Sequence, residues 1–332
     1  MNTELATIMS NEGRVIEWAN NIKYNADLTS EDKEISSVID VWAKEIGNTG
    51  RDKDCKLAEL ITKTITRDTV TAPSELISAM FDEESIGEFD DHRSEYVPEN
   101  TMVPHKAIVG GNVDASYIET KIATPTWTNL QVETYIPMQE LRRGGYKTVA
   151  NYLTYITEAL ECKKVNAILA AVDAAIVSPN ANYIDGSAAT QPSDAVVKQL
   201  ALYLHDISLG DTPIMFARNK YIQTISGLTG VTTYLTDAVK NMYNSTGFVS
   251  QYAGCKLMGF SGERKLADGT VAIPDKRVFG FAGKCGNAIT RGDTRVYEQE
   301  DINSEKVHLK VTGYQFGLEL VRPNMVAKIV LQ

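Results

Sequence analysis

Histidines and cysteines are the residues of this sequence whose types could bind a metal or act as nucleophiles. The four histidines are scattered, and none has a second histidine three to five residues away, the spacing that a metal centre favours. The four cysteines also lie far apart and form no Cys-x-x-Cys pair, which is typical of reduced thiols in a cytosolic compartment. The sequence therefore predicts no metal site among these residues: His92, His105, His205, His308, Cys55, Cys162, Cys255 and Cys285. We expect His205 near the C-terminal end of a helix, and His308 exposed on the face of a strand opposite its apolar residues.

Two glycine-containing segments resemble functional loops only in part. Gly283 and Lys284 could end a phosphate-binding loop, but that motif requires a glycine five residues before the Gly-Lys pair and a serine or threonine after it. This chain has Val278 and Cys285 at those positions. A glycine directly follows Ser261, which is not the spacing of a nucleophile elbow. We therefore expect the protein to be neither an enzyme nor a carrier of a cofactor.

Acidic side chains are concentrated in the first third of the chain. Residues 1–100 contain 10 Lys and Arg against 22 Asp and Glu, whereas the whole chain carries a formal charge of −10. A protein with an isoelectric point of about 5.1 lacks the basic face that duplex binding requires. The densest acidic segment lacks the ordered spacing of a calcium loop, so we expect it to be solvated. Its members are Asp82, Glu83, Glu84, Glu88, Asp90 and Asp91.

Length and composition predict a folded protein with two domains or one large elaborated domain. The chain has 332 residues, and one domain typically has ~150. Its 43% hydrophobic and 23% charged residues are close to the average of soluble globular proteins. No apolar run approaches the roughly 18 residues of a membrane span, and the first residues lack the features of a signal peptide. We therefore expect neither membrane insertion nor export.

Apolar residues at spacings of three and four predict three helices in the acidic third of the chain. Thr29 and Ser30 can cap the first, which ends at residues 48–50. The second covers residues 57–65, and Pro73 opens the third. Their apolar positions are Ile35, Val38, Ile39, Trp42 and Ile46, then Leu57, Leu60, Ile61 and Ile65, then Leu76, Ile77, Met80 and Phe81.

The helical period stops at residue 82, and prolines and glycines interrupt the chain up to about residue 128. Strand-forming pieces flank Gly110, Gly111 and Asn112, which favours a long β-hairpin over disorder. Because an extended hairpin buries little surface against its own chain, we expect it to lie on a neighbouring molecule.

The strongest pattern in the sequence predicts a helix over residues 147–177, roughly 46 Å long at ~1.5 Å per residue. A half-buried strand precedes it, with alternating apolar residues such as Leu130 and Ile136. Residues 180–290 then alternate between helix and strand patterns, with short helices predicted at 221–228 and 235–242. Near the end of the chain the apolar alternation changes parity at residues 312–313, which predicts a β-bulge before a last strand at 326–331.

The order of these elements resembles that in major capsid proteins of tailed bacteriophages with the Hong-Kong-97-like fold. The resemblance extends over about residues 66–332. It implies an α+β fold with an N-terminal arm, an extended β-hairpin loop, a long spine helix, a peripheral domain sheet and an axial α/β domain. The segments that carry it are Val109-Gly110-Gly111-Asn112-Val113, Leu130-Gln131-Val132-Glu133-Thr134-Tyr135-Ile136, Thr212-Pro213-Ile214-Met215-Phe216, Tyr252-Ala253-Gly254-Cys255 and Arg322-Pro323-Asn324-Met325.

The resemblance implies a division of the chain into five parts. Residues 1–65 form an N-terminal helical segment, which is either an enlarged arm or a scaffolding-like segment. The next parts are the acidic N-arm, the hairpin loop, the peripheral domain with the spine helix, and the axial domain. Their bounds are residues 66–100, 101–128, 129–179 with 291–332 (spine helix 147–177), and 180–290.

The resemblance also implies a structural role. A protein of this family self-assembles into hexamers and pentamers of an icosahedral phage head that encloses double-stranded DNA. The implied partners are further copies of the chain, portal and scaffolding proteins, and packaged DNA without sequence-specific contacts. The implied location is the virion, assembled in the cytoplasm of the bacterial host. An encapsulin-like bacterial compartment shell is the alternative, and an α/β enzyme is the third hypothesis.

In such a shell, we expect the hairpin of one subunit to lie over the spine region of the next subunit, and the acidic arm to run along a neighbour's more basic body. Closed assembly converts exposed edges of this kind into buried interfaces. The predicted interface residues are Asp82, Glu83, Glu84, Glu88, Asp90, Asp91, Val109, Gly110, Gly111, Asn112, Lys121, Arg142 and Arg143.

Overall fold

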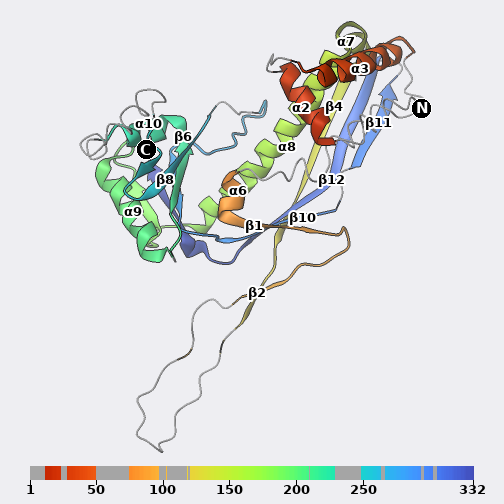
Figure 1. Cartoon of the computed structure of the whole chain (residues 1–332). Coiled ribbons are helices and arrows are strands. Elements are labelled where there is room, and N and C mark those ends of the chain that lie inside the picture. The colour runs from red at the N-terminus through yellow and green to blue at the C-terminus, as the bar shows by residue number, and fades with distance from the viewer. Residues whose placement is uncertain are drawn as a thin grey trace, which may run out of the picture.

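In the described part of the chain, two large β-sheets are connected by one long helix (Figure 1). No helix in the described part of the chain is long and apolar enough to cross a bilayer. The computed structural model describes residues 12–23, 28–49, 75–96, 102, 118, 120–208, 210–228, 248–262, 266–292, 295–301 and 305–332.

The first sheet has five strands and is built around β12. Its strands are β1 (Phe81–Ile86), β4 (Thr126–Pro137), β10 (Gly286–Arg291), β11 (Arg295–Asp301) and β12 (Lys306–Leu320). Strands β4, β10 and β11 all pair with β12 in antiparallel fashion, whereas β1 adds to β10 in parallel. Leu130 and Ile136 of β4 are buried between exposed polar neighbours, so the predicted half-buried strand is confirmed.

A bulge interrupts the long strand β12. The pairing register between β12 and β4 shifts between Val311 and Tyr314, so the bulge predicted at residues 312–313 is confirmed. Before the shift, odd-numbered side chains such as Leu309 are buried, and after it Phe316 is buried. Because side chains alternate between the two faces of a strand, the inserted residue keeps both halves facing one core.

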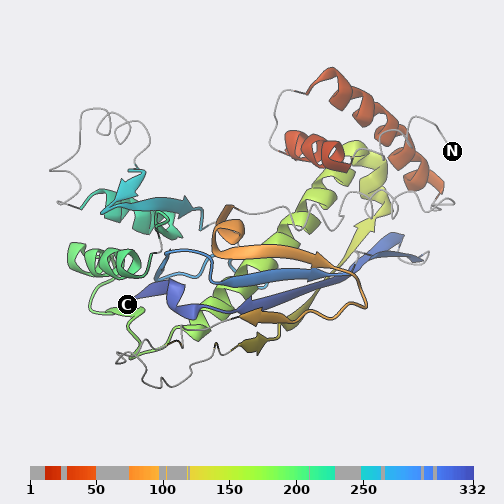
Figure 2. The same ribbon diagram turned by 60° about the horizontal axis from the view of Figure 1, so that its bottom comes forward.

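Helix α8 (Tyr146–Ala175) lies along the five-stranded sheet and is the long helix predicted for residues 147–177 (Figure 2). A short helix, α7 (Met138–Gly144), precedes it, and Gly145 turns the chain between them with φ of +51°. Glycine adopts such a backbone conformation without the steric cost that a Cβ atom imposes. Apolar side chains fill the core side of α8, among them Val149, Leu153, Ile156, Leu160, Ile168, Leu169 and Val172.

The second sheet has six strands in the order β5-β13-β9-β6-β8-β7. Its elements are β5 (Tyr183–Gly186), α9 (Asp194–Ile207), β6 (Ile214–Arg218), α10 (Asn219–Ser226), β7 (Gln251–Tyr252), β8 (Cys255–Phe260), β9 (Arg277–Phe281), the 3-10 helix η1 (Pro323–Met325) and β13 (Val326–Leu331). The alternating helices and strands predicted for this part of the chain are present at β6, α10, β8 and β9. The helix that was also predicted at residues 235–242 lies outside the described residues.

The chain changes sheets at places that differ from the expected boundaries. We expected residues 180–290 in one domain and 291–332 in the other, but β10 already belongs to the five-stranded sheet. The last strand, β13, returns to the six-stranded sheet and pairs with β5 and β9. Periodicity along a strand shows that it is a strand but does not show which distant strand it will pair with.

Two helices from the N-terminal region pack against the end of α8 (Figure 2). They are α2 (Glu12–Lys23) and α3 (Ser30–Thr49). Thr29 caps α3, because its hydroxyl accepts a hydrogen bond from the Asp32 amide at 3.2 Å, so the predicted start is confirmed. The third predicted helix is α6 (Glu75–Met80), after which Phe81 begins β1 rather than extending the helix. The helix predicted for residues 57–65 lies outside the described residues.

A separate two-stranded sheet, which we call the β2–β3 pair, corresponds to the base of the predicted hairpin. Strand β2 (Ser94–Tyr96) pairs in antiparallel fashion with β3 (Lys121–Ala123). The hairpin was predicted for residues 101–128. Its base begins earlier, with β2 at Ser94, and residues 126–128 belong to β4 rather than to the hairpin. The predicted tip around residues 109–112 lies outside the described residues.

Candidate functional site

The acidic segment from residue 82 to 91 contacts basic residues of its own chain. The Asp82 carboxylate forms an ion pair with Lys284, and Glu88 Oε2 lies 2.6 Å from an Arg295 guanidinium nitrogen. The backbone carbonyl of Glu88 also accepts a hydrogen bond from Arg291 at 2.8 Å. We expected this segment to follow a neighbour's basic body, but the partners of Asp82 and Glu88 lie in the same subunit. Each ion pair is about half exposed, so each contributes roughly 0–1 kcal/mol.

Other acidic residues of the segment have local contacts. Asp90 accepts a hydrogen bond from the Gly87 amide at 2.9 Å and closes a turn. Asp91 lies 3.7 Å from Arg93, and both side chains are exposed. These contacts leave the carboxylates accessible at the surface.

Glu83 lies near a buried lysine of the long helix. Lys164 is 2% exposed, and its ammonium lies 5.5 Å from the centre of the Phe316 ring. Burial lowers the pKa of Lys164, an effect that the nearby Glu83 and Glu161 carboxylates oppose. Desolvation likewise raises the pKa of Glu83, which the positive charge of Lys164 opposes. This electrostatic attraction acts between the edge strand β1 and α8.

Glu319 of β12 is a buried carboxylate that contacts Ser94, the first residue of β2. Its side chain is 1% exposed. Its Oε2 atom accepts hydrogen bonds from the Asn287 amide at 2.7 Å and from the Ser94 hydroxyl. Its Oε1 atom has no hydrogen-bond partner among the described residues. These contacts join β2 to β10 and β12 of the five-stranded sheet.

His92 lies between two carboxylates in the same cluster. Its Nε2 atom is 3.7 Å from Glu319 Oε2 and 3.2 Å from the Ser94 hydroxyl, and its Nδ1 atom is 3.4 Å from Glu84 Oε2. Asn287 donates a further hydrogen bond to the Ser94 hydroxyl at 3.1 Å. The cluster is therefore polar, largely buried and shared by four strands.

Large apolar side chains around the β2–β3 pair are exposed. Phe89, which lies between β1 and β2, is 90% exposed, and Ile122 of β3 is 62% exposed. Met102 and Ile118, near the pair in sequence, are also more than half exposed. Exposed apolar side chains that form one contiguous patch mark a site of contact with another molecule.

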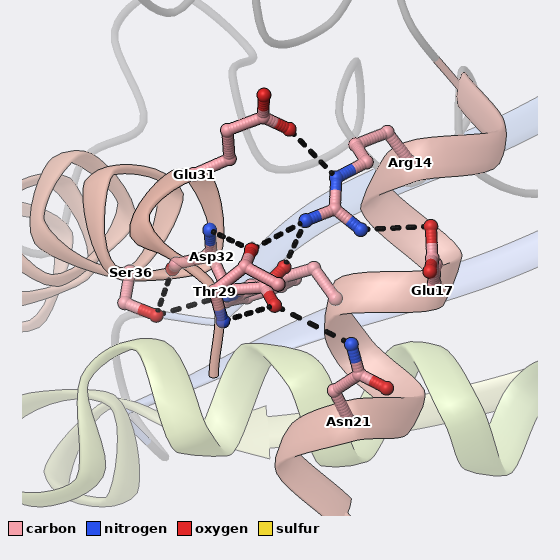
Figure 3. Close-up of polar contacts among 8 residues, drawn as sticks. Arg14, Glu17, Asn21, Thr29, Glu31, Asp32 and Ser36 are labelled. Atoms are coloured by element: carbon pink, nitrogen blue, oxygen red, sulfur yellow. Dashed lines mark hydrogen bonds and ion pairs between the residues drawn. The ribbon is translucent and has the colours of Figure 1, made fainter. Parts of the chain in front are cut away.

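A second polar cluster holds α2 against α3 (Figure 3). The Arg14 guanidinium lies 2.7 Å from Asp32 Oδ1, 2.7 Å from Glu17 and 3.3 Å from Glu31. It also donates a hydrogen bond to the Thr29 hydroxyl at 2.9 Å. Asp32 is fully buried, so its charge depends on these partners.

Apolar side chains of α2 and α3 pack next to this polar cluster. The indole of Trp18 is fully buried and donates a hydrogen bond to the Ser36 hydroxyl at 2.9 Å. Ile39 and Ala43 of α3 are also fully buried and belong to the same core as α8. Near them, Asp40 of α3 lies against the Gly145 turn so closely that a Cβ atom at residue 145 would overlap its carboxylate. The N-terminal helices are therefore a packed part of the subunit.

The other predicted interface residues lie at opposite ends of the molecule. Lys121 is exposed on β3, whereas Arg142 and Arg143 are exposed in the last turn of α7, at the far end of α8 (Figure 1). The four residues 109–112 lie outside the described part of the chain. The structure therefore does not bring Lys121 into one site with Arg142 and Arg143 within a single subunit.

Two cysteines and two histidines of the described residues lie in surroundings that give them no role in catalysis. Burial raises the pKa of Cys255 to about 11 and that of Cys285 to about 12, so both stay protonated at neutral pH and are poor nucleophiles. His205, in the last turn of α9 as expected, lies 2.8 Å from the Ala253 carbonyl. The expectation that His308 is exposed is wrong, because it is half-buried and packs beside the Tyr135 ring.

One cavity of about 260 Å³ opens beside the six-stranded sheet. Its described lining consists of apolar or uncharged residues, including Ile222, Val249 and Leu257. Such a lining supplies no acid or base for catalysis. No group of three potential metal ligands gathers among the described residues either.

Analysis of the sequence missed the two buried clusters. Glu319 alternates with Leu318 and Leu320, so the period of two predicted that it faces water. Charge counts over the first hundred residues do not distinguish Arg14 or Asp32 from the other charged residues there. The usable signal for the second cluster was the Thr-x-x-Asp sequence at residues 29–32, which matches the spacing of a capping box. The first cluster has no local signal, because its members are far apart in sequence.

The sequence and the fold are similar to those of phage capsid proteins. A family model described as "SPbeta prophage-derived putative capsid protein YonB" matches residues 15–330. No curated protein sequence matches the chain.

Three solved structures with similar folds come from phage particles. The asymmetric unit of the bacteriophage PhiM1 mature capsid has a TM-score of 0.50 and 11% identity, over 76% of this chain and 86% of that one. The structure titled Gordonia phage Cozz has a TM-score of 0.51 and 13% identity, over 76% and 84%. The structure titled Mycobacterium phage Adephagia has a TM-score of 0.50 and 12% identity, over 78% and 93%.

Proposed function

The chain belongs to the YonB family of phage capsid proteins and has the Hong-Kong-97-like fold, and we propose on that premise that it is the major subunit of an icosahedral phage head. Copies assemble into hexamers and pentamers and enclose double-stranded DNA. The shell forms in the cytoplasm of the bacterial host, with portal and scaffolding proteins as further partners. Its mechanism is contact between copies rather than catalysis.

The exposed β2–β3 pair is the observation that supports this proposal best. It forms a two-stranded sheet of its own and does not extend either large sheet. A two-stranded pair is marginally stable by itself in water, and Ile122 on β3 is 62% exposed. A neighbouring copy that covers the pair buries these side chains, at about 25 cal/mol for each Å² of apolar surface removed from water.

The charge of the subunit supports loose contact with DNA. Residues 1–100 contain 22 acidic and 10 basic side chains, and several of the acidic ones are exposed at residues 82–91. Acidic surfaces repel phosphates, so the shell confines the packaged DNA without making sequence-specific contacts with it.

The proposal is tested by removing apolar contacts at the β2–β3 pair. We expect purified wild-type protein, alone or with its scaffolding partner, to form shells tens of nanometres across in light scattering and electron microscopy. The double substitution Ile118→Ser and Ile122→Ser should leave the thermal transition of the subunit unchanged and reduce shell yield at least tenfold. Leu202→Ser on α9 is the matched control, since Leu202 is 71% exposed and lies far from the pair. Normal shells from the double variant contradict the proposed contact.

The contents of the shells separate a phage head from a compartment. We expect shells recovered from phage-producing cells to protect DNA of uniform length from nuclease. Shells that contain a folded protein cargo and no DNA would overturn the phage assignment in favour of an encapsulin-like compartment.

A further inference from the structure

Both ends of the β2–β3 pair are joined to the same face of the five-stranded sheet. Side chains two residues apart on a strand point to one face, so Gly317 and Glu319 of β12 share a face, opposite the one that carries the core residue Phe316. Ser94 of β2 contacts Glu319, and Trp127, which follows β3 on β4, is paired with Gly317. The chain therefore enters and leaves the pair at neighbouring points of the sheet.

Hydrogen bonds that link three strands hold the β2 side of the pair. The Ser94 hydroxyl donates to Glu319 Oε2, and the Asn287 amide of β10 donates to Glu319 at 2.7 Å and to Ser94 at 3.1 Å. Glu319 is 1% exposed, so these hydrogen bonds are shielded from water. Hydrogen bonds in a site of low dielectric constant are stronger than those at the surface. We call this network the polar clamp.

An aromatic ring that lies over a glycine holds the β4 side of the pair. A Cβ atom at Gly317 would come within 2.8 Å of the Trp127 ring and 3.1 Å of the Pro125 Cβ atom, so any larger residue there would displace the ring. The Arg291 guanidinium lies 5.4 Å from the centre of the Trp127 ring, within the range of a cation–π interaction. We call this contact the aromatic clamp.

A buried side chain lies between the two clamps. Ile289 of β10 is paired with Gly317 and is fully buried. It lies on the face opposite that of Ala288, its neighbour in the main core. An isoleucine on an open sheet face would be exposed, so this part of the face is covered. The clamps therefore lie in a packed environment rather than on a bare surface.

We propose that the two clamps set the direction of the β2–β3 pair in the free subunit, before any neighbour covers it. One point of attachment leaves a two-stranded pair free to swing, whereas two separate points oppose rotation about either one. An arm with a fixed direction loses less conformational entropy when it docks, which favours association. The use of this arm in a shell rests on the proposed function, but its fixed direction is a property of the single subunit.

Pulsed EPR distances in the unassembled subunit test the clamps. Spin-labelled non-natural residues in place of Lys121 and Gln299, both exposed, report the orientation of the pair relative to β11. We expect one narrow distance distribution when both clamps are intact. Trp127→Ala combined with Ser94→Ala should broaden it about twofold, because both attachments are then lost. Thr128→Ala is the matched control, since the exposed Thr128 adjoins Trp127 and faces the other side of the sheet.

A smaller change tests the aromatic clamp by itself. In Gly317→Ala the added Cβ atom displaces the Trp127 ring. We expect the centre of the distance distribution to shift, while the intact polar clamp keeps the distribution narrow. An unchanged centre would contradict the aromatic clamp.

Two results would overturn the proposal as a whole. One is a distribution in the subunit with intact clamps that is as broad as that of the double variant, and the breadth of the former requires no clamp variant to fold. The other is a narrow distribution that the double variant leaves unchanged. Neither result bears on whether the protein forms shells, so this proposal and the proposed function fail separately.

Discussion

Arg14 and Asp32 form a 2.7 Å ion pair that joins α2 to the first turn of α3. The Asp32 side chain is fully buried and that of Arg14 is 18% exposed. Because burying a lone carboxylate is costly, this pair makes docking of the two helices depend on both residues. The N-terminal helices therefore pack as one unit against α7 and α8.

Removing the Arg14 charge should destabilise this unit. We expect Arg14→Met to lower the free energy of local unfolding of α2 and α3 by about 2–4 kcal/mol, because it leaves the buried Asp32 carboxylate without its cation. Native-state hydrogen exchange of the α3 amides measures this free energy. Lys44→Met is the control, since Lys44 forms an exposed pair with Asp40 at 2.5 Å and should cost less than about 0.5 kcal/mol. Equal effects of the two variants would contradict the prediction.

Acid should release the same helices. Burial of Asp32 opposes its ionisation, but hydrogen bonds from Thr29 and the charge of Arg14 outweigh burial, so its pKa is lowered. A carboxyl with a lower pKa in the folded state stabilises that state above its unfolded pKa, near 3.9. This contribution is lost as the pH falls through the folded-state value. We expect the protection of the α3 amides to decrease below about pH 4, and Asp32→Asn to show a smaller decrease from a lower starting stability.

Gly145 should not tolerate a side chain. It has a φ of +51°, and an added Cβ atom would overlap the Asp40 carboxylate. We expect Gly145→Ala to cost about 1–3 kcal/mol of stability in urea denaturation. At Gly283 an added Cβ atom meets nothing within 4 Å, so Gly283→Ala should change stability by less than about 0.5 kcal/mol. A neutral Gly145→Ala variant would contradict the strained backbone conformation expected at this turn.

The long helix should be intolerant of proline. Ile156 is 3% exposed near the middle of α8, and proline there removes a backbone hydrogen bond and clashes with the preceding turn, at about 3 kcal/mol or more. We expect Ile156→Pro to abolish the cooperative thermal transition. Ile156→Val, which keeps the helix and removes one methyl group, should cost about 0.5–1.5 kcal/mol. An unchanged melting curve for Ile156→Pro would contradict the role of α8 in the core.

Local patterns in the sequence were sufficient for the elements whose order resembles a phage capsid protein. The period of apolar residues predicted α8 within two residues at each end, and the change of parity after Val311 predicted the bulge in β12. Thr29 predicted the start of α3. Each of these features depends on residues close together in the chain, so neighbouring side chains and backbone geometry determine it.

Only the tertiary structure decided which distant segments meet. Lys284 pairs with Asp82 across 202 positions, and Glu319 meets Ser94 across 225. Glu319 has the alternation of a solvent-facing residue, but it is buried and contacts Ser94 of β2 and Asn287 of β10. Likewise β13 lies in the six-stranded sheet, where it pairs with β5 on one side and β9 on the other. Such contacts depend on the register between separate strands, which no local period encodes.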